Sequence, residues 1–162
     1  MPLTRRTRLV LAAGGALLTA GAALAVHAFT GTDADAGLQP AKASGAPHCR
    51  RITDTAPTPL GGLPRRDSSL AGVAVWGKQD IVLRCGVTPP HLTPDPCFAV
   101  DGVDWIIDRA QSAGTRKVIV SYGRTPATQV VFNGPVQTDA ALVELSKLIA
   151  PIRQTYHCIP SR

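Results

Sequence analysis

The stretch WGKQDIVLRCGV, residues 76–87, decides the fold of this chain. Its apolar members Ile81, Leu83 and Cys85 recur at every second position, which is the period of a strand with one buried face, and Arg84 points to the other face. The residues GKQD before them form a hairpin-sized loop after the strand-like run AGVAVW, residues 71–76. The stretch therefore predicts a β-hairpin with a cysteine on its buried side.

The same period of two continues downstream and then changes. Three further strands are predicted in GVDWIIDR, RKVIVSYG and ATQVVFNG, which span residues 102–109, 116–123 and 127–134. Residues 141–152 follow helical spacing, with Thr138 or Asp139 as the cap and an end near Ala150, before a proline. Prolines and glycines in residues 49–69 allow at most one short turn of helix, between Arg50 and Thr55. We expect an α+β domain: a meander-like antiparallel sheet of about five strands with a C-terminal helix on one face.

The N-terminus has the pattern of an export signal. Arg5, Arg6 and Arg8 precede an uncharged run at residues 9–29, which is close to the ~20 residues that span a bilayer as a helix. The pattern fits a membrane anchor or a cleaved signal peptide, and in both cases the arginines stay in the cytoplasm. We expect a leader at residues 1–30 that contacts the membrane through residues 9–29, a flexible stalk at 31–47 and a disulfide-bonded domain at 48–162. The domain then lies outside the cell membrane, either attached to a single-pass anchor or secreted after the leader is cleaved.

All four cysteines follow the leader, and an even number in an exported chain predicts disulfides. Cys85 and Cys97 are separated by a proline-rich segment that could return the chain to its start, which favours a bond between them. Cys49 and Cys158 then pair by elimination and would tie the ends of the domain together. Sequence alone does not separate the three possible connectivities.

Two other roles for the cysteines are less favoured. A nucleophilic thiol needs a basic, partly open setting, and Cys85 shares a face with apolar residues. A zinc site could use His48, Cys49, His157 and Cys158. Zinc requires thiolates, and the cysteine pairs two to four residues apart that are typical of zinc sites do not occur. We therefore expect no metal and no cofactor.

The charge distribution argues against a nucleic-acid partner. Three of the 17 Lys and Arg residues belong to the leader, which leaves 14 against 11 acidic residues, a net charge of +3 for the rest. These basic residues are scattered, and aromatic residues make up only 4% of the chain, whereas nucleic-acid binders combine a basic stripe with stacking aromatics.

The charged residues of the strands define a weak candidate surface site. Asp104 and Asp108 share a strand face about 13 Å apart, too far for the paired carboxylates of a glycosidase. Alternation places Arg84 and Asp104 on outward positions, and Arg124 follows in a turn. We expect these three residues to be solvated. Leu83, Trp105 and Tyr122 are expected to face the helix.

Several sequence blocks together resemble a known family. LGGLPRR, AVWGKQDIVLRCGV, GVDWII, YGRTPATQVVF and ALVELSKLI, in this order, resemble an actinobacterial family catalogued as domain of unknown function 3515, over about residues 49–158. The resemblance implies a single-pass or secreted envelope protein and carries no catalytic residue. The matching positions are Trp76, Gly77, Arg84, Cys85, Gly86, Cys97, Asp104, Trp105, Tyr122, Gly123 and Arg124.

The sequence is consistent with two functions. The first is a non-catalytic binding or accessory module of the cell envelope, whose partner is an envelope protein or a wall polymer. The second is a small envelope hydrolase or transferase with a site near Asp104, Tyr122 and Arg124. A pocket with convergent polar groups and a perturbed carboxylate would favour the enzyme, and an exposed patch on a smooth fold would favour the module.

Overall fold

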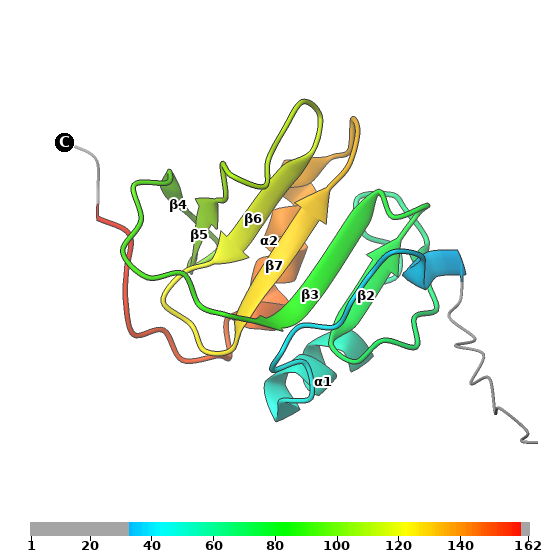
Figure 1. Cartoon of the computed structure of the whole chain (residues 1–162), viewed down its shortest axis with the longest axis horizontal. Helices are drawn as coiled ribbons and strands as arrows, with labels where there is room; N and C mark the ends of the chain where they lie inside the picture. Colours follow the sequence, from blue (N-terminus) through cyan, green and yellow to red (C-terminus); the bar gives the residue numbers. More distant parts are fainter. Residues whose placement is uncertain (1–32, 160–162) are drawn as a thin grey trace, which may run out of the picture.

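A computed structural model describes residues 33–159 of the chain. It is an α+β fold in which two helices cover one face of a seven-stranded antiparallel sheet (Figure 1). The α+β class and the C-terminal helix are thus confirmed, with seven strands rather than five. The elements are η1 (Asp33–Asp35), α1 (Pro47–Asp54), β1 (Arg65–Arg66), β2 (Val73–Trp76), β3 (Ile81–Val87), β4 (Cys97–Val100), β5 (Val103–Ile107), β6 (Lys117–Ser121), β7 (Ala127–Phe132) and α2 (Thr138–Ile149).

The strand order, β1-β2-β3-β7-β6-β5-β4, is not that of a simple meander. After β3 the chain crosses to the opposite edge of the sheet, forms β4, and returns through β5 and β6 until β7 pairs with β3. Leu83 lies opposite Val130 and Arg84 opposite Gln129 in that central pair. The hairpin predicted from residues 71–87 is confirmed as β2 and β3.

The elements missed in the sequence are the short ones. β1 has two residues and β4 four, too few for a period of two to stand out. The helix α1 has eight residues rather than a single turn, and Pro47 occupies its first turn, where a missing N–H costs nothing. The expected cap of α2 is also wrong, because Gln137 occupies the cap position and makes no side-chain hydrogen bond.

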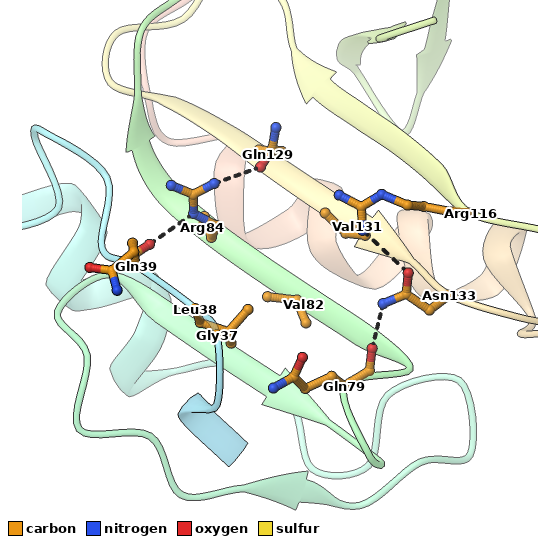
Figure 2. Close-up of a pocket in the computed structure, with 10 residues that line it drawn as sticks. All are labelled: Gly37, Leu38, Gln39, Gln79, Val82, Arg84, Arg116, Gln129, Val131 and Asn133. Carbon is orange, nitrogen blue, oxygen red and sulfur yellow. Dashed lines mark hydrogen bonds between the residues drawn. The ribbon is translucent and has the colours of Figure 1, made fainter. Parts of the chain in front are cut away.

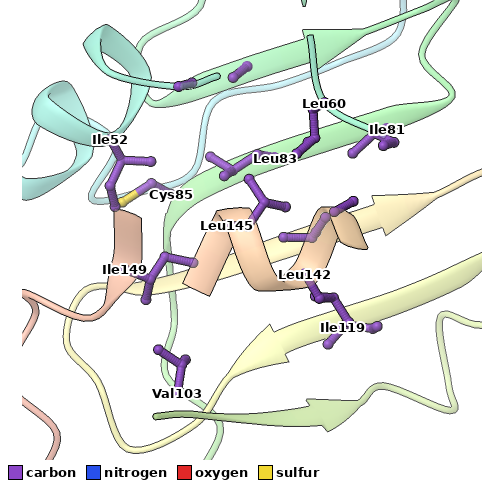
Figure 3. Packing of buried hydrophobic residues seen from close by; sticks show 14 of the residues in the cluster. Ile52, Leu60, Ile81, Leu83, Cys85, Val103, Ile119, Leu142, Leu145 and Ile149 are labelled. Carbon is purple, nitrogen blue, oxygen red and sulfur yellow. The ribbon is translucent and has the colours of Figure 1, made fainter. Parts of the chain in front are cut away.

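The main core lies between the helices and one sheet face (Figure 3). Leu83 and Trp105 are fully buried there, as expected, and the indole Nε1 of Trp105 donates to Ser146 Oγ of α2 at 3.0 Å. Tyr122 was expected in this core but packs in a separate cluster with Val120 and Ile106. The α2 side chains in the core are Ala141, Leu142, Leu145 and Ile149.

The segment expected to be a flexible stalk packs against the other sheet face. Residues 33–46, here called the N-terminal strap, run past β2 and β3. Asp35 accepts hydrogen bonds from the backbone and hydroxyl of Ser69, both at 2.9 Å, and Ala43 N donates to Gly86 O at 3.0 Å. The folded unit therefore includes this strap, and the stalk prediction is wrong for its residues. Most strap side chains are small, and the apolar ones follow no regular period, so their burial could not be predicted from the sequence.

The disulfide pairing differs from the prediction. Cys49 of α1 bonds Cys85 of β3, and Cys97 of β4 bonds Cys158. Three strands separate β3 from β4 in the sheet, so Cys85 and Cys97 lie about 19 Å apart, against the less than 7 Å between Cα atoms that a disulfide requires. The error came from assuming that the proline-rich segment returns to its start, whereas it crosses the sheet.

Between residues 33 and 159, no helix has the length and apolarity needed to cross a bilayer. The predicted leader at residues 1–30 lies outside the described residues, so its role as anchor or signal stays a prediction.

Candidate functional site

Arg124, expected in a solvated turn, is instead buried, with 5% of its surface exposed. Its Nη1 donates to the carbonyl oxygens of Ala150, at 3.0 Å, and of Ile152. Its Nη2 donates to Gly102 O at 3.1 Å and to Gln154 Oε1 at 2.9 Å. Arg124 therefore fastens the chain that leaves α2 to the turn between β4 and β5.

Asp104, also expected to be solvated, is 9% exposed and belongs to the same network. Its Oδ2 accepts hydrogen bonds from Gln154 Nε2 at 2.7 Å and from Cys158 N at 2.8 Å, and His157 Nδ1 lies 3.5 Å away. Burial lowers the pKa of Arg124, and the Asp104 carboxylate acts in the opposite direction.

Together, Asp104, Arg124, Gln154 and the Cys97–Cys158 disulfide form what we call the C-terminal clasp. Gly123 lets the clasp close: its φ is +69°, and a Cβ there would lie 2.0 Å from Tyr156 O. The side chains of the clasp are committed to holding the C-terminal segment. Asp104 and Arg124 are therefore not available to a substrate, which argues against the hydrolase site proposed from the sequence.

Arg84 does not join the clasp and lies in a hollow on the sheet face opposite α2 (Figure 2). The hollow, here called the groove, has a volume of about 460 Å³ and lies between the N-terminal strap and strands β3 and β7. The candidate trio is thus divided between two regions. The groove is lined by Gly37, Leu38, Gln39, Gln79, Val82, Arg84, Arg116, Gln129, Val131 and Asn133.

Two guanidinium groups of the groove bind side chains on β7 and on the residue that follows it. Arg84 Nη1 donates to Gln129 Oε1 at 3.2 Å, and its Nε donates to Gln39 O of the strap at 3.0 Å. Arg116 Nη1 donates to Asn133 Oδ1 at 3.3 Å. Gln129 of β7 and Asn133, which follows β7, are four residues apart, so the Cα atoms of the two acceptor residues lie about 13 Å apart in an extended chain.

The amide groups of the groove are mostly saturated by these contacts. Asn133 Nδ2 donates to Gln79 O at 2.7 Å, and Gln79 Nε2 donates to Ala34 O and Ala36 O at 3.1 and 2.8 Å. By contrast, among residues 33–159 no protein acceptor is found for Nη2 of Arg84 or of Arg116. Both guanidinium groups therefore keep N–H donors for a ligand, and the groove favours a ligand rich in acceptors.

The groove lacks the groups that general acid–base or nucleophilic catalysis needs. None of its ten lining residues carries a carboxylate, imidazole, thiol or hydroxyl group. Its floor between the arginines is apolar and consists of Val82 and Val131, which are 3% and 5% exposed. Such a surface can bind and orient a ligand but offers no general acid, general base or nucleophile.

Sequence reasoning found Arg84 but missed Arg116, Gln129 and Asn133. The signal was present in QVVFN, because the face Thr128, Val130 and Phe132 implies an opposite face of Gln129, Val131 and Asn133. Two amides in an otherwise apolar strand mark a face that meets water or a ligand. The contribution of Arg116 depends on the pairing of β6 with β7, which the sequence did not reveal.

A second hollow, of about 390 Å³, lies beside the clasp and is mainly apolar. It is lined by Pro90, His91, Leu92, Tyr122 and Tyr156. Leu92 and Tyr156 are 93% and 66% exposed. The four residues of the zinc hypothesis do not meet there or elsewhere, because Cys49 and Cys158 belong to different disulfides.

The family model described as Protein of unknown function (DUF3515) matches residues 10–156, most of the chain. The chain belongs to this family. The resemblance noted in the sequence is thereby confirmed, and the match extends to residues before Cys49. No curated protein and no solved structure matches the chain.

The blocks on which the DUF3515 resemblance rests are largely structural in this chain. Trp76 and Trp105 are fully buried in the core, and Arg124 and Gly123 close the clasp. Of the matching positions, Arg84 is the one that lines the groove. The blocks that match the family therefore mainly serve the fold of this chain, and a ligand has to be inferred from the groove.

Proposed function

We propose that this chain is an exported or membrane-anchored binding module of the cell envelope that performs no catalysis itself. The observation that carries the proposal is the composition of the groove: two guanidinium groups over an apolar floor, with no acid, base or nucleophile in its lining. Polar groups converge there, as in a ligand site, but the perturbed carboxylate that would favour an enzyme is not among them.

Two observations support the exported location. All four cysteines are paired in disulfides, which form and persist in oxidising compartments. The uncharged run at residues 9–29 follows three arginines, as in a signal or anchor. A reporter fused after Arg162 is expected to work only if it is of an exported type. The intact mass of the mature protein decides between an anchor and a cleaved signal.

Binding through the groove can be tested by site-specific crosslinking in intact cells. A photoreactive residue is introduced in place of Gln39, which lines the groove, or in place of Lys147, which is exposed on α2 as a matched control. We expect a discrete adduct from position 39, and its loss in the double variant Arg84→Gln, Arg116→Gln. An adduct from position 147 alone would refute binding at the groove.

The absence of catalysis is tested separately with purified chain and isolated cell envelopes. We expect neither released soluble fragments nor new linkages over long incubation. Turnover that persists in the double variant would show catalysis at a site outside the groove. Turnover that is lost in the double variant would show that the groove is an active site.

A further inference from the structure

The spacing of the two arginines selects a particular kind of ligand. Arg84 is held at Gln129 of β7 and Arg116 at Asn133, the residue that follows β7, and Val131 lies between Gln129 and Asn133 on the same side (Figure 2). The two cationic groups therefore bind acceptor residues whose Cα atoms are about 13 Å apart, and the residues between these acceptors are apolar on the groove side. A single small anion would meet one end only.

From this arrangement we infer that the groove takes an extended peptide segment of the pattern acid–x–apolar–x–acid; the inference rests on the proposed function. In an extended chain, residues one and five point to the same side, about 13 Å apart, and residue three lies between them. The two carboxylates meet Arg84 and Arg116, whose Nη2 donors are free within the described part of the chain. The apolar residue meets Val82 and Val131.

The charge balance favours carboxylates on both ends. Each guanidinium offers planar N–H donors that match a carboxylate, and charge-assisted hydrogen bonds of this kind are stronger than neutral ones. The lining contains no acidic residue to repel them. A neutral glycan is less suited, because the groove lining lacks aromatic side chains for stacking and most of its amide groups are already engaged.

The chain itself does not supply this segment. Residues 1–32 contain no Asp or Glu, so the N-terminal leader cannot provide the two carboxylates. Asp104, Ile106 and Asp108 have the required spacing, but Asp104 and Ile106 are 9% and 3% exposed and belong to the clasp and the adjoining cluster. A second copy of the folded chain therefore cannot dock by this segment. The occupant is an acidic segment of another envelope protein.

Binding is tested by titrating the purified full chain with short labelled peptides and measuring fluorescence anisotropy. The probe is acetyl-Glu-Ser-Val-Ser-Glu-amide. Its matched control, acetyl-Ser-Glu-Val-Glu-Ser-amide, has the same composition with its acids half as far apart. We expect the control to bind about tenfold more weakly, because it reaches one arginine at a time. A peptide with Gln in place of both Glu residues should not bind, and added salt should weaken the probe.

The protein variants identify the site. Arg84→Gln and Arg116→Gln should each weaken probe binding about tenfold. Lys117→Gln makes the same change in charge next to Arg116. Lys117 pairs with Phe132 and alternates onto the face of Ile119, which packs in the main core, so this variant should bind within about twofold of the parent. Equal losses in Lys117→Gln would show attraction by overall charge alone and overturn the inference.

A second probe, poly(glycerol phosphate), tests whether the ligand of the groove is a wall polymer instead of a peptide. If this polymer binds with the same dependence on both arginines and the spaced peptide does not, the peptide inference is wrong and the groove remains a binding site. If no probe binds while the crosslink from position 39 persists, the ligand class is wrong but the proposed function stands. If the crosslink is also lost, both fail.

Discussion

The clasp and the groove both use arginine on the same sheet, yet they use it in opposite ways. Arg124 of the clasp is 5% exposed, and its two Nη atoms donate to four oxygen atoms of the chain. Arg84 of the groove is half-buried and has two acceptors from the chain, Gln39 O and Gln129 Oε1. The difference lies in the supply of acceptors, because the end of a helix provides free carbonyl groups and a strand face does not.

The number of guanidinium N–H groups without an acceptor in the chain distinguishes a structural arginine from one that is available to a ligand. A saturated, buried guanidinium holds its own chain, and its loss leaves buried carbonyl groups unpaired. A guanidinium that lines the groove with free N–H groups can donate hydrogen bonds to a ligand. Its loss should leave the free energy of unfolding almost unchanged. The predictions below test this division.

The largest expected effect is on the clasp disulfide. Replacing both Cys97 and Cys158 by Ser should lower the free energy of unfolding by roughly 4 kcal/mol, because the bond closes a loop over a sequence separation of 61. Denaturant unfolding of the purified protein measures this change. The variant should still bind the spaced peptide where it is folded. Loss of binding by the folded variant would mean that clasp and groove are coupled.

Arg124→Ala is expected to cost about 3 kcal/mol, since the carbonyl groups of Ala150 and Ile152 lose their donor in a buried setting. The matched comparison is Arg116→Ala, which changes an exposed arginine just before β6 and should alter stability by less than about 0.5 kcal/mol. Equal costs for the two, measured by denaturant unfolding with the disulfides intact, would remove the distinction between clasp and groove.

Two glycines with similar backbones sharpen the account of the clasp. Gly123 and Gly134 have φ values of +69° and +75°, so alanine is strained at both by about 1 kcal/mol. A Cβ at Gly134 meets nothing within 4 Å, whereas one at Gly123 lies 2.0 Å from Tyr156 O. Gly123→Ala should therefore cost clearly more than Gly134→Ala in thermal unfolding. Similar costs would mean that the segment around Tyr156 moves aside freely.

Local patterns predicted the elements that bury one face regularly. The alternation of Ile81, Leu83 and Cys85 identified β3, and helical spacing identified α2 at Thr138–Ile149. The order of the strands could not be read in the same way, because pairing β3 with β7 joins residues far apart in the sequence. That missing order also explains the wrong disulfides, since Cys85 and Cys97 are near in sequence and far apart across the sheet.

The candidate site was only partly predictable. Alternation placed Arg84 and Asp104 on the face opposite the main core, and Arg124 followed in a turn. Alternation does not say what covers that face. The C-terminal segment covers Asp104 and Arg124, while the strap borders Arg84 without covering it. Long-range packing of two segments without a periodic pattern therefore decided which arginines remain available.

The smallest expected effect concerns the stability of the groove variants. Arg84→Gln removes a hydrogen bond to the exposed Gln39 O and one to Oε1 of Gln129, which is 5% exposed but lines the groove. Solvent entering the groove can replace the donor at both, so the variant should cost less than about 1 kcal/mol. Arg116→Gln should cost still less, because its side chain is exposed. Unfolding in urea with the disulfides intact measures both. If Arg84→Gln costs as much as Arg124→Ala, Arg84 is holding the N-terminal strap in place, and weaker peptide binding by that variant would then reflect a displaced strap rather than a lost contact with the ligand.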